Sequence, residues 1–392
     1  MLVLKAVTNV IQYDIGILLV EVVEHLKEIS KLETRQRFSH IDLLESIAIF
    51  FVITYHSTLY FYDITQDNAV LNYILYYGRT ILSTCVPLFF FANGYLLFNQ
   101  KFELRKHIKK IIRLLILILI WAIIRMPLML VFSGEPIRIK TIVFNILELR
   151  TDYKTNHFWF LGALICIYIL FPALKALFDL NKKGFIFFTV ACAILTFGFV
   201  LGNQVIVFAR AVFNVSIPDL NYPFITMFNP FRGSYGYSFV YFCVGGLIFT
   251  YEDKILSISK VKRNTISVIG IILSCFILFL VGVFYSKFLN GELWDVVWNG
   301  YDTVFTFFNT IFIYLLCLNY TKNYWLIRNV SKNTLGIYFV HAILIHATRP
   351  WIQTQDFLCN LPINIVYAIL ILFICLLLCI IIRKIPIIKK LI

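Results

Sequence analysis

Apolar runs of roughly 20 residues, the length that a helix needs to cross a bilayer, follow one another along most of this chain. Polar residues gather in short segments between the runs and at their ends. Ten candidate spans follow from this pattern, at about residues 41–61, 76–98, 111–133, 157–178, 185–208, 236–250, 265–286, 302–320, 333–348 and 361–383. The sixth and ninth are short and have room to extend into their flanks. We therefore predict an all-α, polytopic membrane protein, a bundle of about ten transmembrane helices.

The first 36 residues break this pattern. The apolar stretch 2–20 is interrupted by four polar residues, and a charged segment follows it. We predict an amphipathic helix on the cytoplasmic membrane surface, with an additional first span as the alternative. The chain is accordingly divided into an N-terminal segment, 1–36, and a transmembrane domain, 37–392.

Composition and charge agree with a membrane protein. Hydrophobic residues make up 60% of the 392 and charged residues 14%, with a mean hydropathy of +0.84, whereas a soluble domain has roughly a quarter charged residues. The net charge of +14 lies in short basic clusters between the apolar runs, which is typical of cytoplasmic loops and not of a nucleic-acid-binding surface. With the amino terminus inside, the cytoplasmic segments hold 24 Lys and Arg residues and the outer loops eight. Both termini are therefore predicted to be cytoplasmic.

The sequence contains no motif of a soluble enzyme and no metal site. The nine cysteines lie mostly within apolar runs, without a C-x-x-C pair, as expected of small residues in a membrane core. Phosphate-binding, nucleophile-elbow, zinc-protease and dinucleotide fingerprints are missing. His341 and His346 are five residues apart and do not share a helix face. We predict neither a metal nor a permanently bound cofactor.

Four ionisable residues at one predicted depth form the strongest candidate site. His56 and Arg125 lie in the outer thirds of the first and third spans, Arg79 near the outer end of the second, and His157 at the start of the fourth. Ionisable groups within a membrane are costly and usually face the bundle interior or a wet cavity. The alternatives are structural, because Arg79 can snorkel to the outer headgroups, His157 can sit at the interface and His56 can be a satisfied core histidine.

The first span also places carboxylates on the stripe that carries His56. Glu45 lies eleven residues before His56, and eleven positions return to nearly the same face of a helix. The helix rise puts these two residues about 16 Å apart, too far for Glu45 to orient the imidazole. Asp42 lies one turn earlier.

Four stretches, in order, resemble the acyltransferase 3 family of integral membrane acyltransferases. IDLLESIAIFFVITYH resembles its first helix, where a histidine follows an aspartate by fourteen residues, as His56 follows Asp42. CVPLFFFANGYLLF, HFWFLGALICIYILFPAL and SKNTLGIYFVHAIL are similar to three later helices of the family. The resemblance covers residues 37–383.

The resemblance implies transfer of an acyl group, usually acetyl, from cytosolic acyl-CoA to a sugar hydroxyl at the outer face. A hydroxyl attacks a thioester poorly unless a base accepts its proton, and imidazole titrates near neutral pH. His56 is the candidate base or, alternatively, a transient acyl carrier. Arg79 and Arg125 are the candidates that stabilise the oxyanion.

The remaining candidates bind the two substrates. For acyl-CoA they are a polar residue of the second helix and three basic residues of the segment KFELRKHIKKIIR: Asn93, Arg105, Lys109 and Arg113. For the acceptor they are His157, Trp159, Arg232 and His341. Glu45 stands where the family has a basic residue, and Asn93 stands where it has a serine. We therefore expect the basic segment to bind the CoA phosphates in place of the first helix.

The leading hypothesis is thus a bacterial plasma-membrane O-acyltransferase that modifies a cell-surface or lipid-linked glycan. Its partners would be the lipid bilayer, acyl-CoA and the glycan, with no nucleic acid, and a homo-oligomer is compatible with this function. A carrier or flippase for a polar or lipid-linked sugar is the alternative, although a carrier does not require an imidazole at position 56. A third reading, the other large membrane acyltransferase superfamily, would make His341 essential and His56 dispensable.

Overall fold

The computed structural model describes residues 37–57, 63–65, 69–132, 156–220, 235–352, 361–386 and 389. These residues form helices joined by turns, with no strand among them. The predicted N-terminal segment 1–36, Arg232 and most of the two long outer loops lie outside the described residues.

Helices follow one another along the described chain. In order they are α2 (Ser39–Ser57), α3 (Val70–Arg79), α4 (Cys85–Phe98), α5 (Leu104–Phe132), α7 (Trp159–Leu180), α8 (Lys182–Ala193), α9 (Phe199–Phe213), α11 (Gly236–Thr250), α12 (Glu252–Leu256), α13 (Lys260–Phe284), α14 (Val304–Cys317), α15 (Trp325–Ile352) and α17 (Leu361–Lys384). Short 3-10 and π segments join or extend them: η1 (Thr80–Thr84), η2 (Asn156–Phe158), η3 (Ile194–Gly198), η4 (Tyr285–Asn290) and η5 (Trp298–Gly300).

The all-α prediction is confirmed, and each predicted span overlaps a helix or a continuous helical run in the described residues. Six of these runs are long and apolar enough to cross a membrane: Val70–Phe98, Leu104–Phe132, Trp159–Leu180, Lys182–Phe213, Lys260–Lys287 and Pro362–Lys384. The sixth predicted span is the short helix α11, whereas the ninth lies within the much longer α15. The number of crossings and the side on which the termini lie remain predictions.

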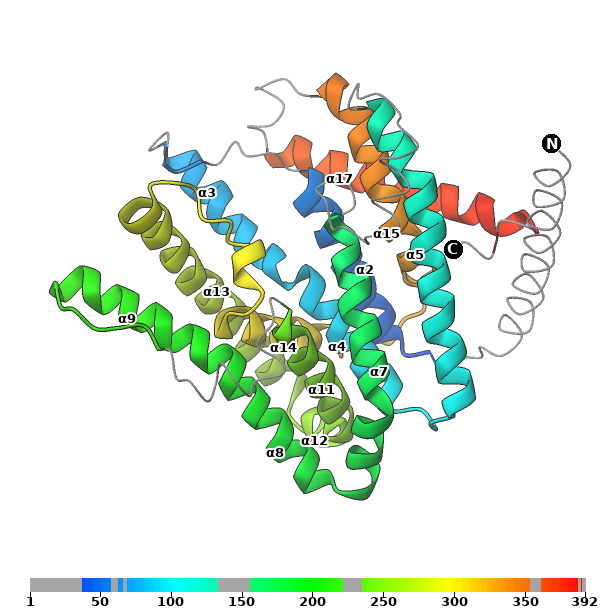
Figure 1. Cartoon of the computed structure of the whole chain (residues 1–392), viewed down its shortest axis with the longest axis horizontal. Coiled ribbons are helices and arrows are strands. Elements are labelled where there is room, and N and C mark those ends of the chain that lie inside the picture. The colour runs from blue at the N-terminus through cyan, green and yellow to red at the C-terminus, as the bar shows by residue number, and fades with distance from the viewer. Residues whose placement is uncertain are drawn as a thin grey trace, which may run out of the picture.

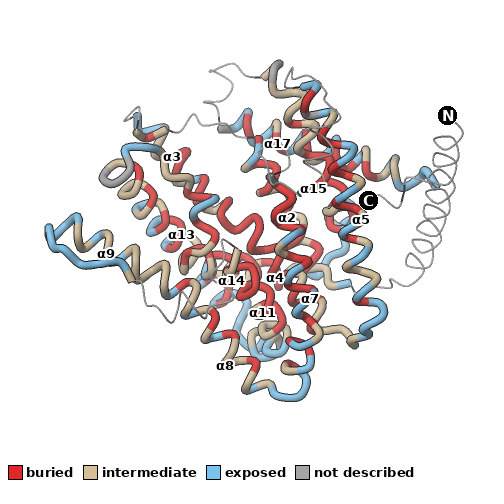
Figure 2. The backbone as a smooth tube through the Cα atoms, in the orientation of Figure 1, coloured by how far each residue is buried: buried red, intermediate tan, exposed pale blue. Residues whose placement is uncertain are grey.

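α2 lies at the centre of the bundle (Figure 1). It packs against α4 on one side and against α15 and α17 on another, and α11 packs on the far side of α4. Buried residues concentrate on α2, α4 and α11, whereas α9 runs away from the centre (Figure 2). Because α2 and α15 are in contact along their lengths, a side chain on one can meet a side chain on the other at more than one level.

Glycines allow α4 and α11 to approach each other closely. A Cβ atom added to Gly94 would lie 1.8 Å from the carbonyl oxygen of Phe242, and one added to Gly245 would lie 2.1 Å from that of Phe91. Both distances are far inside van der Waals contact, so only glycine fits at either position. Helices in membranes commonly pack through small residues in this way, because backbones in close contact gain dispersion energy.

We expect Gly245→Ala to destabilise the protein, because the new methyl group must displace the α4 backbone. Overpacking of this kind costs about 1–3 kcal/mol, which should appear as a lower midpoint of thermal unfolding in detergent. Gly162→Ala is the matched control, since a Cβ atom there meets nothing within 4 Å. Equal midpoints for the two variants would contradict the close packing of α4 on α11.

Candidate functional site

Three histidines from three parts of the chain come together where α2 ends. His56 lies in the last turn of α2, His157 in η2 and His341 in the middle of α15. The ring centroid of His341 is 5.4 Å from that of His56 and 5.7 Å from that of His157. His157 and His341 are buried, whereas His56 is exposed. We call these residues, with Arg125, the histidine cluster; its open side is at His56.

Arg125 of α5 supplies the positive charge of the histidine cluster. Its guanidinium is buried and donates a hydrogen bond to a ring nitrogen of His157, which must therefore be unprotonated. The same guanidinium lies 5.5 Å above the ring of Phe158. The hydroxyl of Tyr338, on α15, donates to the carbonyl oxygen of His157. These contacts tie α5, η2 and α15 together at one level.

His341 has a fixed hydrogen-bonding arrangement. Its Nδ1 lies 3.2 Å from the carbonyl oxygen of Ile337, and because a carbonyl only accepts, Nδ1 carries the proton. In the part of the chain that the structure describes, its other nitrogen, Nε2, is buried without a hydrogen-bond partner. Leaving a buried polar atom unsatisfied costs about 1–3 kcal/mol, so this nitrogen is an expected contact for a ligand.

Arg79 belongs to a neighbouring group. It is buried, its Nη2 lies 3.7 Å from Oδ1 of Asp295, and its guanidinium lies 4.8 Å over the ring of Tyr55. The hydroxyl of Tyr55 donates to Oδ2 of Asp295 at 2.8 Å. Because the rings of Tyr55 and His56 are 5.0 Å apart, this group borders the histidine cluster. Arg79 is thus an interior residue, and the alternative that it snorkels to the headgroups does not fit its burial.

Trp159 lies beside the histidine cluster in a set of aromatic rings. It stacks on Tyr235, with the ring centroids 4.6 Å apart, and Trp298 meets it edge to face at 5.5 Å. Trp298 retains 39% of its surface exposed. An exposed indole over other rings suits stacking against the apolar face of a sugar.

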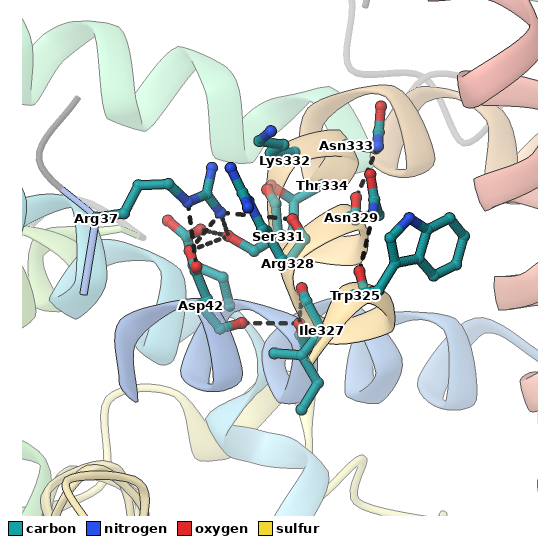
Figure 3. A network of polar contacts seen from close by, with 12 residues as sticks. Arg37, Asp42, Trp325, Ile327, Arg328, Asn329, Ser331, Lys332, Asn333 and Thr334 are labelled. Carbon is teal, nitrogen blue, oxygen red and sulfur yellow. Dashed lines mark hydrogen bonds and ion pairs between the residues drawn. The ribbon is translucent and has the colours of Figure 1, made fainter. Parts of the chain in front are cut away.

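At the other end of α2 a polar network connects it to α15 (Figure 3). The hydroxyl of Ser331 lies 2.8 Å from Oδ1 of Asp42 and 2.7 Å from Oε2 of Glu45. A hydroxyl has one proton, so it donates to one of these carboxylates at a time. Arg37 forms an ion pair with Asp42 at 2.7 Å. Glu45 thus holds α15 and does not contact His56, as its predicted distance requires.

The residues predicted to bind acyl-CoA lie in two places. Asn93 connects α4 to α7, because its side chain accepts from the hydroxyl of Tyr168 at 2.9 Å and donates to the carbonyl of Phe89. Arg105, Lys109 and Arg113 follow one another at four-residue intervals on α5, hence on one face, with Arg105 exposed.

Three further basic residues near the Ser331 network were not among the predicted candidates. The guanidinium of Arg383, in the last turn of α17, donates to the carbonyl oxygen of Lys332 at 2.6 Å. Partial burial, together with the charges of Arg328, Arg37 and Arg383, lowers the pKa of Lys332. Arg328, Lys332 and Arg383, together with Arg37, form the basic cluster. The basic residues of segments 322–332 and 383–390 are the sequence signal for this cluster.

Cysteine and metal chemistry find no support in the described residues. The eight cysteines among them are free, and all but Cys166 are buried. No group of three potential metal ligands occurs in the described part of the chain. What the histidine cluster offers is an exposed imidazole for proton transfer, a buried cation and a buried hydrogen-bond acceptor.

We expect Ser331→Ala to weaken the contact between α2 and α15. Two buried carboxylates would lose a hydroxyl donor, and hydrogen bonds to charged groups contribute roughly 1.5–3 kcal/mol. Thermal unfolding in detergent measures the loss as a lower midpoint. Ser257→Ala is the control, because Ser257 is exposed and donates to the carbonyl of Lys254. If both variants unfold like the wild type, Ser331 does not hold the two helices together.

Comparison with known proteins agrees with this architecture. Residues 38–384 match the model of the acyltransferase 3 family, described as an acyltransferase domain. No curated protein and no solved structure is significantly similar to the chain. The match spans the helical bundle and both polar sites, and it favours an enzyme over a carrier. The chain belongs to the acyltransferase 3 family of membrane proteins and is an acyltransferase.

Proposed function

We propose that the protein transfers an acyl group, of which acetyl is the simplest, from cytosolic acyl-CoA to a hydroxyl of a cell-surface or lipid-linked glycan on the outer side of the bacterial plasma membrane. The observation that carries this proposal is the histidine cluster: an exposed imidazole beside a buried arginine. The basic cluster, at the other end of α2 and α15, is the natural place for the phosphates of CoA. The two substrates then approach from opposite ends of the same helices.

In the proposed reaction His56 is the general base. The acceptor hydroxyl gives its proton to the imidazole as its oxygen attacks the thioester carbonyl, forming the new C–O bond. When the tetrahedral intermediate collapses, the C–S bond breaks and the thiolate of CoA takes the proton from His56. The step therefore consumes no net proton. The exposure of His56 suits this role, since both substrates must reach it.

Arg125 is placed to stabilise the oxyanion that forms on the thioester oxygen. Preorganised donors in a dry site stabilise developing charge more than water does, because they need no reorganisation during the reaction. The bond to His157 holds the Arg125 guanidinium in place. Arg79 faces Asp295, which offsets its charge, so we assign it to shaping the site through Tyr55 and His56.

The donor would bind with its phosphates on the basic cluster and on the basic face of α5 formed by Arg105, Lys109 and Arg113. Arginine binds phosphate through paired donors, whereas lysine acts as a point charge. Arg113 is near enough to Arg383 for their charges to interact, which joins the two sets. Asn93 would lie along the path of the pantetheine arm. The acceptor would rest on Trp159 and Trp298, with His157 and His341 as polar contacts.

We expect His56→Ala to reduce acyl transfer by at least 100-fold, the usual range for loss of a general base. The assay is transfer of label from acetyl-CoA to an extract of surface glycan by the purified protein. His346→Ala is the matched control, a half-buried histidine of α15 outside the histidine cluster. Wild-type turnover in the His56 variant would remove it from the reaction.

The double variant Arg328→Gln and Lys332→Gln should raise the KM for acetyl-CoA about tenfold or more, because two cations near the phosphates are lost. The KM for glycan should not change. Lys322→Gln tests for a general effect of surface charge, since Lys322 is exposed and contacts Tyr324. An unchanged KM for acetyl-CoA would place the phosphates elsewhere.

A further inference from the structure

The Nε2 atom of His341 requires a hydrogen-bond donor from the ligand that binds in the histidine cluster. His341 is fully buried, and its Nδ1 proton is engaged by the carbonyl of Ile337. Nε2 therefore presents a lone pair and accepts hydrogen bonds. Within the described residues nothing donates to it.

The surroundings of His341 show where the missing donor must come from. The neighbouring groups are the rings of His56, His157 and Tyr338 and the charge of Arg125. The Tyr338 hydroxyl is already committed to the carbonyl of His157, and no N–H group of Arg125 forms a hydrogen bond with Nε2 of His341. The nearest group with an exposed side is His56, at a ring separation of 5.4 Å. A molecule that reaches His56 is therefore the available donor.

We propose that Nε2 of His341 accepts a hydrogen bond from a second hydroxyl of the acceptor, next to the hydroxyl that reacts, so that the enzyme acts on a diol. This inference rests on the proposed function, in which the proton of the reacting hydroxyl goes to His56. That proton is then not available to His341. A neighbouring hydroxyl on the same sugar ring has its own proton and is fixed in position by the ring.

Such an arrangement gives the site selectivity. A buried acceptor that is satisfied only by the correct ligand rejects an analogue without the matching donor, because the nitrogen is then left unpaired and desolvated. The second hydroxyl also restrains rotation of the acceptor about the reacting C–O bond, which holds the attacking oxygen against His56 and toward the thioester carbonyl carbon. His341 is in this view a substrate-binding residue, and His56 alone transfers the proton.

Substitutions at His341 distinguish the effect of its hydrogen-bond acceptor from the effect of its side-chain volume. His341→Gln can place a side-chain oxygen near the position of Nε2, whereas the shorter His341→Asn cannot, and His341→Leu has no acceptor. We expect the Asn and Leu variants to lower kcat/KM for surface glycan about tenfold or more. The Gln variant should retain most of the wild-type value. The KM for acetyl-CoA should stay constant throughout. His346→Gln serves as the control, and the Gln–Asn comparison stands if the Leu variant does not fold.

Three results would overturn the proposal. Equal activity of the Gln and Asn variants would show that the atom at Nε2 is not used. A raised KM for acetyl-CoA with an unchanged KM for glycan would assign Nε2 to the pantetheine amide. An NMR spectrum of the product that places the acyl group on an exocyclic primary hydroxyl, whose neighbouring carbon carries no hydroxyl, would exclude the diol.

The expected spectrum shows the acyl group on a ring carbon beside a carbon with a free hydroxyl. These outcomes are distinct from failure of the proposed function itself. That failure would appear as no transfer by the wild-type protein or as full activity of His56→Ala.

Discussion

The contact between α2 and α15 is the constraint on which the rest of the structure depends. Ser331 of α15 meets Glu45 of α2 at one level, and His341 meets His56 at another. The two intervals are ten residues on α15 and eleven on α2, about 15 and 16 Å by the helix rise. The helices therefore run parallel in one register, and a shift of either would break both contacts. This register fixes the separation between the basic cluster and the histidine cluster.

The two buried arginines near His56 differ in what balances their charge. Arg79 faces Asp295, and a tyrosine hydroxyl shares that carboxylate. In the described part of the chain no carboxylate acts on Arg125, whose contacts are an imidazole, an aromatic face and a tyrosine. A guanidinium already neutralised by a carboxylate stabilises a developing oxyanion less than one that is not. This difference, and not depth alone, makes Arg125 the stronger candidate for the oxyanion.

The sequence predicts how deep each residue lies along its helix, but not which neighbouring helix its side chain faces. Apolar run lengths and basic loops set depth, which is why His56, Arg125 and His157 were expected at one level and do lie together. Direction around a helix depends on which neighbour it packs against, and in a span that is apolar on all sides the periodicity is weak. For that reason the contact of His341 with His56, and the ion pair between Arg79 and Asp295, could not be predicted. Family resemblance indicated that His341 matters without showing what it touches.

The same limit explains why the effect of the charge reversal at Glu45 could not be predicted from the sequence. Judged along one helix, a carboxylate at a position where the family has a cation should repel the phosphates of acyl-CoA. In the folded protein Glu45 receives a hydrogen bond from Ser331, and Arg37 pairs with the neighbouring Asp42. Cations from two other helices, Arg328, Lys332 and Arg383, lie around the network and exceed its carboxylates. The electrostatic potential at this end of the bundle is thus set by the convergence of α2, α15 and α17. A single charge reversal on α2 is compatible with an anion-binding role, because the other helices supply the positive charge.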